Sequence, residues 1–240
     1  PDRGLYDRAR DPQGRIVIVP ARPLLRAYVP PRREMGQGPV YAAAAARAGH
    51  DRVWPLGALA ADNDFMVAGV RSLGGYHPAK LAAYERIRRF LYETDEPPGR
   101  VAAWLAARVV AVPGDLSREA RAYLNELGLD LSAEPLARDG GMSLYENRAA
   151  LSRARLYTQW TPSAAGRAEG EIDGFLQRLQ AGEVPFESVL TLDRALDIAP
   201  QPPGQPLPAP EFLRDDLNEV VVRTAAAIPT VLLLADIATP

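Results

Sequence analysis

The alternation of apolar and polar residues predicts a succession of short helices and short strands. Leu81, Tyr84, Ile87 and Leu91 recur at helical spacing, and most of the arginines between them fall on other faces, so residues 78–92 are expected to form an amphipathic helix. Because the two kinds of element alternate without a regular β–α–β rhythm, the expected fold class is α+β. The other expected helices cover residues 40–50, 101–107, 117–127 and 164–180. The expected strands cover residues 52–56, 108–112, 144–146, 154–158, 188–192, 219–226 and 230–235, and residues 15–19 are expected to form a strand or an extended linker.

Proline and glycine divide the chain into four expected parts. Residues 1–39 form a lead or linker rich in arginine and proline, and residues 40–199 form the α+β domain. Six of the eleven residues from 200 to 210 are proline, which favours an extended, semi-rigid connector. Residues 211–240 then form a C-terminal β segment, which we expect to be an incomplete part of a β-sandwich-like sheet in a longer chain.

Composition excludes several classes of site. The 240 residues carry a formal net charge of −2, which provides no general basic surface for nucleic acid. The absence of cysteine removes disulfides, thiolate zinc sites, iron–sulfur clusters and cysteine nucleophiles. Since His50 and His77 are the two histidines, we expect no metal site and no cofactor. The net charge leads us to expect no nucleic-acid partner. No apolar run approaches the roughly 20 residues that a membrane-spanning helix needs.

The segment Gly74-Gly75-Tyr76-His77-Pro78 is the first candidate binding site. Paired glycines allow a close approach of the backbone, and a helix that follows them would present amide groups to an anion or a sugar hydroxyl. His77 is able to exchange a proton near neutral pH. The alternative is a tight turn that leads into the helix, with His77 as a turn or capping residue. The segment has neither a P-loop nor a GxGxxG pattern.

A second candidate site combines Tyr145, Glu146 and Asn147 with Arg153. A phenol, a carboxylate, an amide and a guanidinium can together hydrogen-bond sugar hydroxyls, and the tyrosine ring offers a stacking face. Alternatively, Asn147 caps a turn while Arg153 pairs with Glu146 across a hairpin. No nucleophile elbow is present, and we assign no catalytic residue.

Several longer strings resemble the soluble region of YfhO-like bacterial membrane proteins. Two of them contain the candidate sites: Ser72-Leu-Gly-Gly-Tyr-His-Pro-Ala-Lys-Leu81 and Leu144-Tyr-Glu-Asn-Arg-Ala-Ala-Leu-Ser-Arg-Ala-Arg-Leu156. In the second string, Ser152 stands where the family usually has proline. The resemblance extends over about residues 40–240 and includes residues 51–57, 63–66, 108–112 and 230–240.

The resemblance implies a protein with many membrane helices that is similar to lipid-linked-sugar glycosyltransferases of the GT-C type. In that architecture the soluble region lies on the extracytoplasmic face of the bacterial cytoplasmic membrane, and the catalytic carboxylate lies on an early loop that this chain does not match. The expected function is therefore that of a non-catalytic accessory domain that binds or orients a cell-envelope saccharide acceptor and contacts its own transmembrane core.

A structural or interaction domain, which packs on its membrane core or on another envelope protein, is the alternative function. An independent hydrolase is the least expected, because no nucleophile–base pair is evident. An exposed surface that carries Tyr76, His77, Tyr145 and Arg153 together would favour saccharide binding. Burial of these side chains in separate places would favour the structural role.

Overall fold

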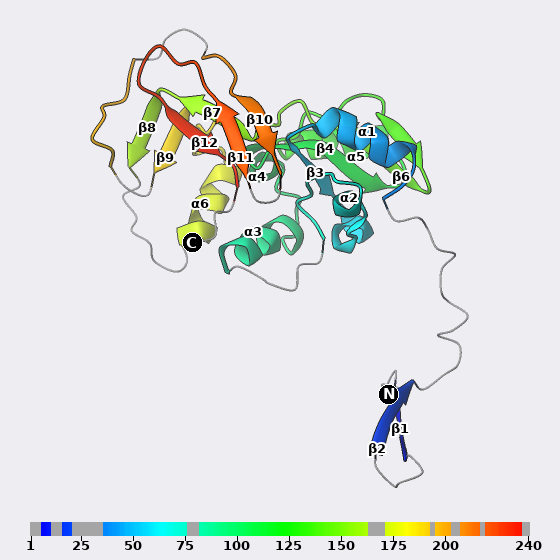
Figure 1. The fold of residues 1–240 in the computed structure, drawn as a ribbon. Coiled ribbons are helices and arrows are strands. Elements are labelled where there is room, and N and C mark those ends of the chain that lie inside the picture. Colours follow the sequence, from blue (N-terminus) through cyan, green and yellow to red (C-terminus); the bar gives the residue numbers. More distant parts are fainter. Residues whose placement is uncertain are drawn as a thin grey trace.

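The protein has an α+β fold (Figure 1). The structure, a computed structural model, describes residues 6–10, 16–20, 36–75, 82–162, 171–192, 195–202, 207–216 and 219–236. Near the N-terminus, β1 (Tyr6–Arg10) and β2 (Ile16–Pro20) pair as an antiparallel ladder.

A four-stranded sheet is the centre of the fold. Its order is β3 (Arg52–Pro55), β4 (Ala107–Pro113), β6 (Met142–Glu146) and β5 (Ala137–Asp139). Strands β3 and β4 are parallel, whereas β6 is antiparallel to both of its neighbours. A parallel pair needs a long crossover, and here the chain between β3 and β4 contains η2 (Gly57–Ala61), α2 (Asp64–Val67), α3 (Ala82–Tyr92) and α4 (Gly99–Trp104).

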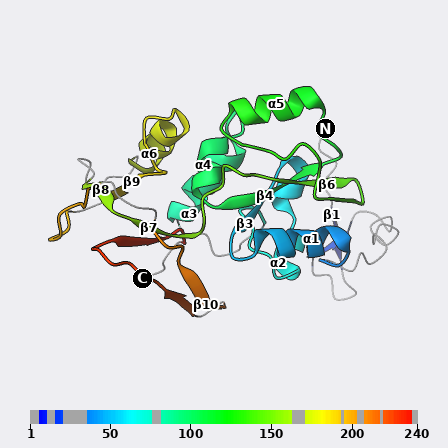
Figure 2. The same cartoon turned by 90° about the horizontal axis from the view of Figure 1, so that it is seen from above.

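Helices cover both faces of this sheet. Helix α1 (Pro39–Ala48) lies on one face, while α4, α5 (Arg118–Glu126) and α6 (Glu171–Gln180) lie on the other (Figure 2). Successive residues of β4 alternate between the two cores, as the two-residue repeat of a strand requires. Val109 and Ala111 belong to the core under α1, and Val110 and Val112 belong to the core on the opposite face.

A second group of strands follows the sheet in the sequence. Strand β7 (Ala154–Tyr157) pairs antiparallel with β12 (Val231–Leu234), and β10 (Glu211–Asp215) pairs antiparallel with β11 (Val220–Arg223). Strands β8 (Gln159–Pro162) and β9 (Val189–Leu192) are parallel, with α6 between them in the sequence. Tyr157, Trp160 and Leu190 form a small core here, against apolar side chains of β12.

Most of the expected elements are present, with shifted ends. The helix expected over residues 101–107 begins at Gly99 and ends at Trp104, because Ala107 already pairs with β3. Two of the expected helices begin outside the described residues, at positions 78–81 and 164–170. The pattern did not predict β1, η2, α2, β5, β8 or β10, which are short elements stabilised by their neighbours.

The hairpin interpretation of residues 144–158 is wrong. Strand β6 is flanked by β4 and β5, and β7 pairs with β12. The four-part domain division and the β-sandwich-like C-terminal sheet remain predictions. In the described part of the chain, β10 pairs with β11 in one two-stranded ladder, and β12 pairs with the earlier strand β7 in another.

Neighbouring alanines of α1 provide a test of the layered core. Ala44 is fully buried against the sheet, whereas Ala45 is exposed. Ala44→Leu is expected to lower the free energy of unfolding by about 1–3 kcal/mol, because the added methyl groups overfill a packed interface. Ala45→Leu is expected to change it by less than about 0.5 kcal/mol, since it alters a surface position with a similar helix propensity. Urea denaturation measures both values, and equal effects would contradict this packing.

Candidate functional site

Gly74 and Gly75 are packed closely against the protein's own chain. A Cβ atom at Gly74 would lie 2.6 Å from Cγ of Pro55 and 2.7 Å from the carbonyl oxygen of Ala60. Gly75 has φ of +99°, and a Cβ atom there would lie 2.6 Å from Oδ1 of Asn63. The two glycines are therefore required by the approach of this turn to β3, η2 and the start of α2.

Two buried polar atoms near this turn belong to side chains that interact with each other and have no other hydrogen-bond partner among the described residues. They are Nε1 of Trp54 and the hydroxyl of Tyr92, and that hydroxyl is 3.1 Å from the place that a Gly74 Cβ atom would take. Burial raises the pKa of Tyr92 well above its usual range. Tyr76 and His77, the other candidate residues of this segment, lie outside the described residues.

Tyr145 and Glu146 make contacts that stabilise the fold. Tyr145 is buried in the core, and its hydroxyl accepts a hydrogen bond of 3.1 Å from the backbone amide of Leu116. Glu146 forms an ion pair with Arg47 of α1. The expected pairing of Glu146 with Arg153 is therefore wrong, because the two strands are not arms of one hairpin.

Asn147 is a buried hydrogen-bonding centre. Its Nδ2 donates to the carbonyl of Ala107 at 3.0 Å, and its Oδ1 accepts from the amides of Asp130 at 3.1 Å and Ala149 at 3.2 Å. The last bond is the turn-capping contact that the sequence suggested as an alternative. Since its side chain has no exposed surface, Asn147 holds the turn after β6 and does not reach solvent.

Arg153 is fully buried between the two C-terminal aspartates. Its Nε and Nη2 donate to Asp236 at 2.9 and 2.5 Å, and its Nη1 donates to Asp215 at 2.8 Å. The guanidinium carbon lies 5.2 Å from the ring centre of Phe212 in β10. Burial by itself lowers the pKa of Arg153, but the bonds to both carboxylates outweigh it and raise this pKa.

Each of these two aspartates has a further cationic partner. Asp215 also pairs with Arg71 and accepts a bond of 2.8 Å from Nδ1 of His50 when that nitrogen carries a proton. Asp236 also pairs with Arg52, at 2.5 Å. Burial lowers the pKa of Arg52 to about 10 in spite of Asp236.

We call this group the Arg153 cluster. Its residues come from the start of β3, from the segment after α2, from the position just before β7, from the end of β10 and from the position two residues after β12. The members are Asp51, Arg52, Arg71, Arg153, Asp215 and Asp236. Asp51 belongs to the group because its Oδ1 accepts a hydrogen bond of 2.8 Å from the backbone amide of Arg153.

The structure thus places the predicted site residues in different surroundings. Gly74 and Gly75 support a turn, Tyr145 and Asn147 are part of the core, and Arg153 is enclosed by carboxylates. By the criterion stated above, the burial of Tyr145 and Arg153 favours structural roles for these two side chains.

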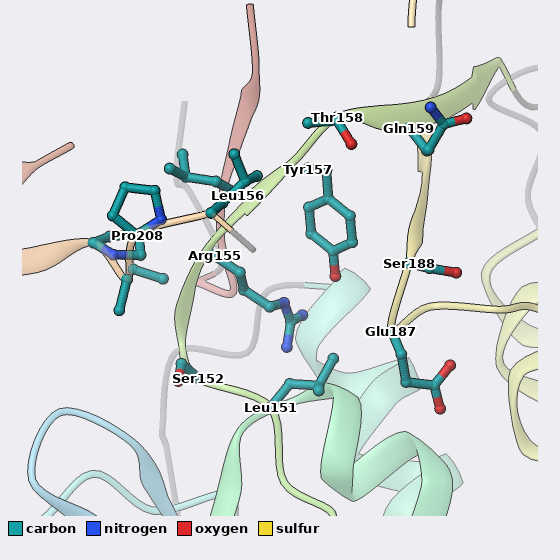
Figure 3. A pocket seen from close by; sticks show the side chains of 14 residues that line it. Leu151, Ser152, Arg155, Leu156, Tyr157, Thr158, Gln159, Glu187, Ser188 and Pro208 are labelled. Atoms are coloured by element: carbon teal, nitrogen blue, oxygen red, sulfur yellow. The ribbon is translucent and has the colours of Figure 1, made fainter. Parts of the chain in front are cut away.

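A cavity of about 450 Å³ lies along β7, immediately after Arg153 (Figure 3). Hydroxyl, amide, guanidinium and carboxylate groups alternate with apolar side chains around it. Its lining consists of Leu151, Ser152, Ala154, Arg155, Leu156, Tyr157, Thr158, Gln159, Glu187, Ser188, Leu207, Pro208, Ala209 and Pro210. We call it the β7 pocket.

Arg155 is the most unusual residue of the β7 pocket. It is 9% exposed, and its Nη2 donates to the carbonyl of Trp104 at 3.0 Å. Its Nε and Nη1 have no hydrogen-bond partner in the described part of the chain. The hydroxyl of Tyr157 donates to the carbonyl of Phe186 at 2.7 Å. Burial lowers the pKa of Arg155, and Tyr157 opposes this only in part.

The sequence pattern pointed to Arg153 and not to Arg155. Arg153 directly precedes β7 and Arg155 is its second residue, so the two-residue repeat of an extended chain puts them on the same side. The difference between them is set by partners that lie far away in the sequence: Asp215 and Asp236 reach Arg153 and not Arg155.

The described residues contain neither a cluster of metal-ligating side chains nor a membrane-spanning helix. No group of three or more histidine, cysteine, aspartate or glutamate side chains is placed to hold a metal ion there. Within the same residues, every helix is too short or too polar to span a membrane.

Comparison with known proteins finds no matching family model, no matching curated protein and no matching solved structure. The resemblance to YfhO-like proteins therefore stays a prediction based on the strings quoted above.

Removal of Arg153 is expected to be strongly destabilising. Arg153→Met leaves Asp215 and Asp236 without their shared buried cation, so the free energy of unfolding should fall by about 3–5 kcal/mol. Arg223→Met removes an exposed pair with Glu211 and should cost less than about 1 kcal/mol. Urea denaturation of both variants gives the comparison, and similar small losses would show that the cluster contributes little.

Acid should weaken the same cluster. Burial by itself raises the pKa of Asp215 and Asp236, but hydrogen bonds from Arg153 and the nearby arginine charges lower both values overall. Their stabilisation is therefore complete above the unfolded-state pKa of about 3.9 and is lost as the pH falls through the lower folded-state values.

We expect the free energy of unfolding to fall as the pH is lowered from 5 to 3. This fall should be smaller in Asp236→Asn, which lacks one of the two groups. Urea titrations at several pH values measure both slopes, and equal slopes would exclude Asp236 as a cause.

Proposed function

We propose that this chain is a non-catalytic extracytoplasmic accessory domain of a YfhO-like membrane glycosyltransferase, and that it binds or orients a cell-envelope saccharide acceptor. The proposal begins from the resemblance of residues 72–81 and 144–156 to that family. It adds a location for the contact, which is the β7 pocket.

The observation that carries the proposal is the course of residues 144–156. Most of the first half of this string is buried and structural, whereas its second half supplies five pocket residues in sequence order: Leu151, Ser152, Ala154, Arg155 and Leu156. The same string that carries the resemblance therefore borders a cavity. A volume of about 450 Å³ is within the range of small-molecule sites, about 300–1,000 Å³.

The chemistry of the lining favours binding over catalysis. Ser152 and Ser188 are exposed hydroxyls at the rim, and Thr158 and Gln159 follow along the strand end, so donors and acceptors suited to sugar hydroxyls are available. Glu187 is the one carboxylate among the described lining residues. Glycoside hydrolysis ordinarily uses a pair of carboxylates, which supports a non-catalytic role.

A second function, that of a structural or interaction domain, is favoured by a different observation. Tyr145, Asn147 and Arg153 are buried and bonded within the fold, so these parts of the string are accounted for by folding alone. Under this proposal the domain packs on its membrane core or on another envelope protein and contacts no saccharide.

Saccharide titration distinguishes the two functions. We expect at least one of tri-N-acetylchitotriose, maltotriose and trigalacturonate to shift NMR signals of pocket residues in the folded chain. Ser152→Trp should weaken that binding at least tenfold, because a large ring at the exposed rim fills the cavity. Ala46→Trp, which adds the same ring on the exposed face of α1, should leave it unchanged.

Binding that is equally strong in both tryptophan variants would place the contact outside the β7 pocket. Failure of all three saccharides to bind the folded chain would favour the structural function.

A further inference from the structure

We propose that the β7 pocket recognises an anionic oxygen group on its ligand, a carboxylate or a phosphate of an acidic saccharide, through the guanidinium of Arg155. This inference rests on the proposed saccharide-binding function and adds the class of ligand. Its basis is the unused hydrogen-bonding capacity of one nearly buried cation.

The first step is the cost of leaving Arg155 as it is. A buried guanidinium loses its hydration, and this loss is compensated only when its N–H groups and its charge find partners. Arg155 gives one N–H group to Trp104, while Nε and Nη1 remain unpaired in the described structure. No carboxylate of the described residues forms an ion pair with it.

The nearby Arg153 gives an internal comparison. It is two residues away on the same short segment, and its buried guanidinium is bonded to two aspartates. Arg153 therefore has carboxylate partners within the described residues, and Arg155 has none. An external anion would complete Arg155 in the way that Asp215 and Asp236 complete Arg153.

The second step is access. Figure 3 shows the guanidinium of Arg155 between the ring of Tyr157 and the side chain of Leu151, with Ser152 and Glu187 nearby. The two unpaired nitrogens are covered by the pocket wall in this conformation. The proposal therefore includes a rotation of the long Arg155 side chain toward the cavity that it already lines.

The third step is the charge of the rim. Glu187 is the acidic group that an anionic ligand would meet, and its carboxylate lies 3.4 Å from Nη2 of Arg100. That pairing offsets part of its charge. Neutralising Glu187 should consequently strengthen anion binding, which is the opposite of what is expected if Glu187 were itself the missing partner of Arg155.

The experiment compares acidic probes with uncharged counterparts of the same backbone. Trigalacturonate is titrated against its fully methyl-esterified form, and glycerol 3-phosphate against glycerol, with NMR signals of pocket residues as the readout. We expect at least one acidic probe to bind at least tenfold more tightly than its neutral counterpart, and that preference should shrink as salt is added. The probe that shows the preference identifies the carboxylate or the phosphate as the anionic group.

Three variants of the pocket complete the test. Arg155→Met should abolish the preference for the acidic probe while keeping or raising the melting temperature, because it removes a buried charge that lacks a partner. Glu187→Gln should tighten binding of the acidic probe at least twofold, and it tests the proposal even if Arg155→Met does not fold. Arg223→Met, which removes an exposed cation elsewhere, should leave both preference and affinity unchanged.

The outcomes separate the two proposals. If neutral and acidic probes bind the pocket equally, the anionic inference fails and the saccharide-binding function stands. If no probe and no saccharide binds, the saccharide-binding function fails as well. Weaker binding and a lower melting temperature in Glu187→Gln would identify Glu187 as the internal partner of Arg155 and overturn the inference.

Discussion

The fully buried guanidinium of Arg153 is the constraint on which the arrangement of the chain depends. A cation removed from water is tolerated only with counter-charges beside it, and Asp215 and Asp236 supply them from strand segments more than sixty residues away. Because Arg52 and Arg71 bind the same two carboxylates, the C-terminal strands are tied to the edge of the central sheet by ion pairs as well as by the β7–β12 ladder.

This arrangement also sets the position of the β7 pocket, which we propose as the ligand site. Arg153 fixes the start of β7, and the same strand then contributes its next residues to the wall of the β7 pocket. The guanidinium of Arg153 is paired with two aspartates, whereas two residues further along the guanidinium of Arg155 keeps two unpaired N–H groups in the described structure. The unpaired N–H groups of Arg155 are the reason that we propose the β7 pocket as the binding site.

The candidate site could be predicted only in part. The sequence singled out the strings around Gly74 and Tyr145 as candidate binding sites, and the described residues in them are explained by close packing, a core hydroxyl and a capped turn. A polar residue at a turn has the same appearance in a sequence whether it binds a ligand or the backbone. Its role depends on which distant groups come within about 3 Å, and no local pattern contains that information.

By itself, the sequence determined the α+β class and the approximate position of most helices and strands, because helical and strand periodicities are local properties of the chain. It also determined that cysteine and multi-histidine chemistry are absent. The parallel pairing of β3 with β4, the pairing of β7 with β12 and the different surroundings of Arg153 and Arg155 were decided only by the tertiary structure. The physical reason is that the burial of a side chain and its ion pairs depend on contacts with residues far away in the sequence. These contacts form only when the chain folds.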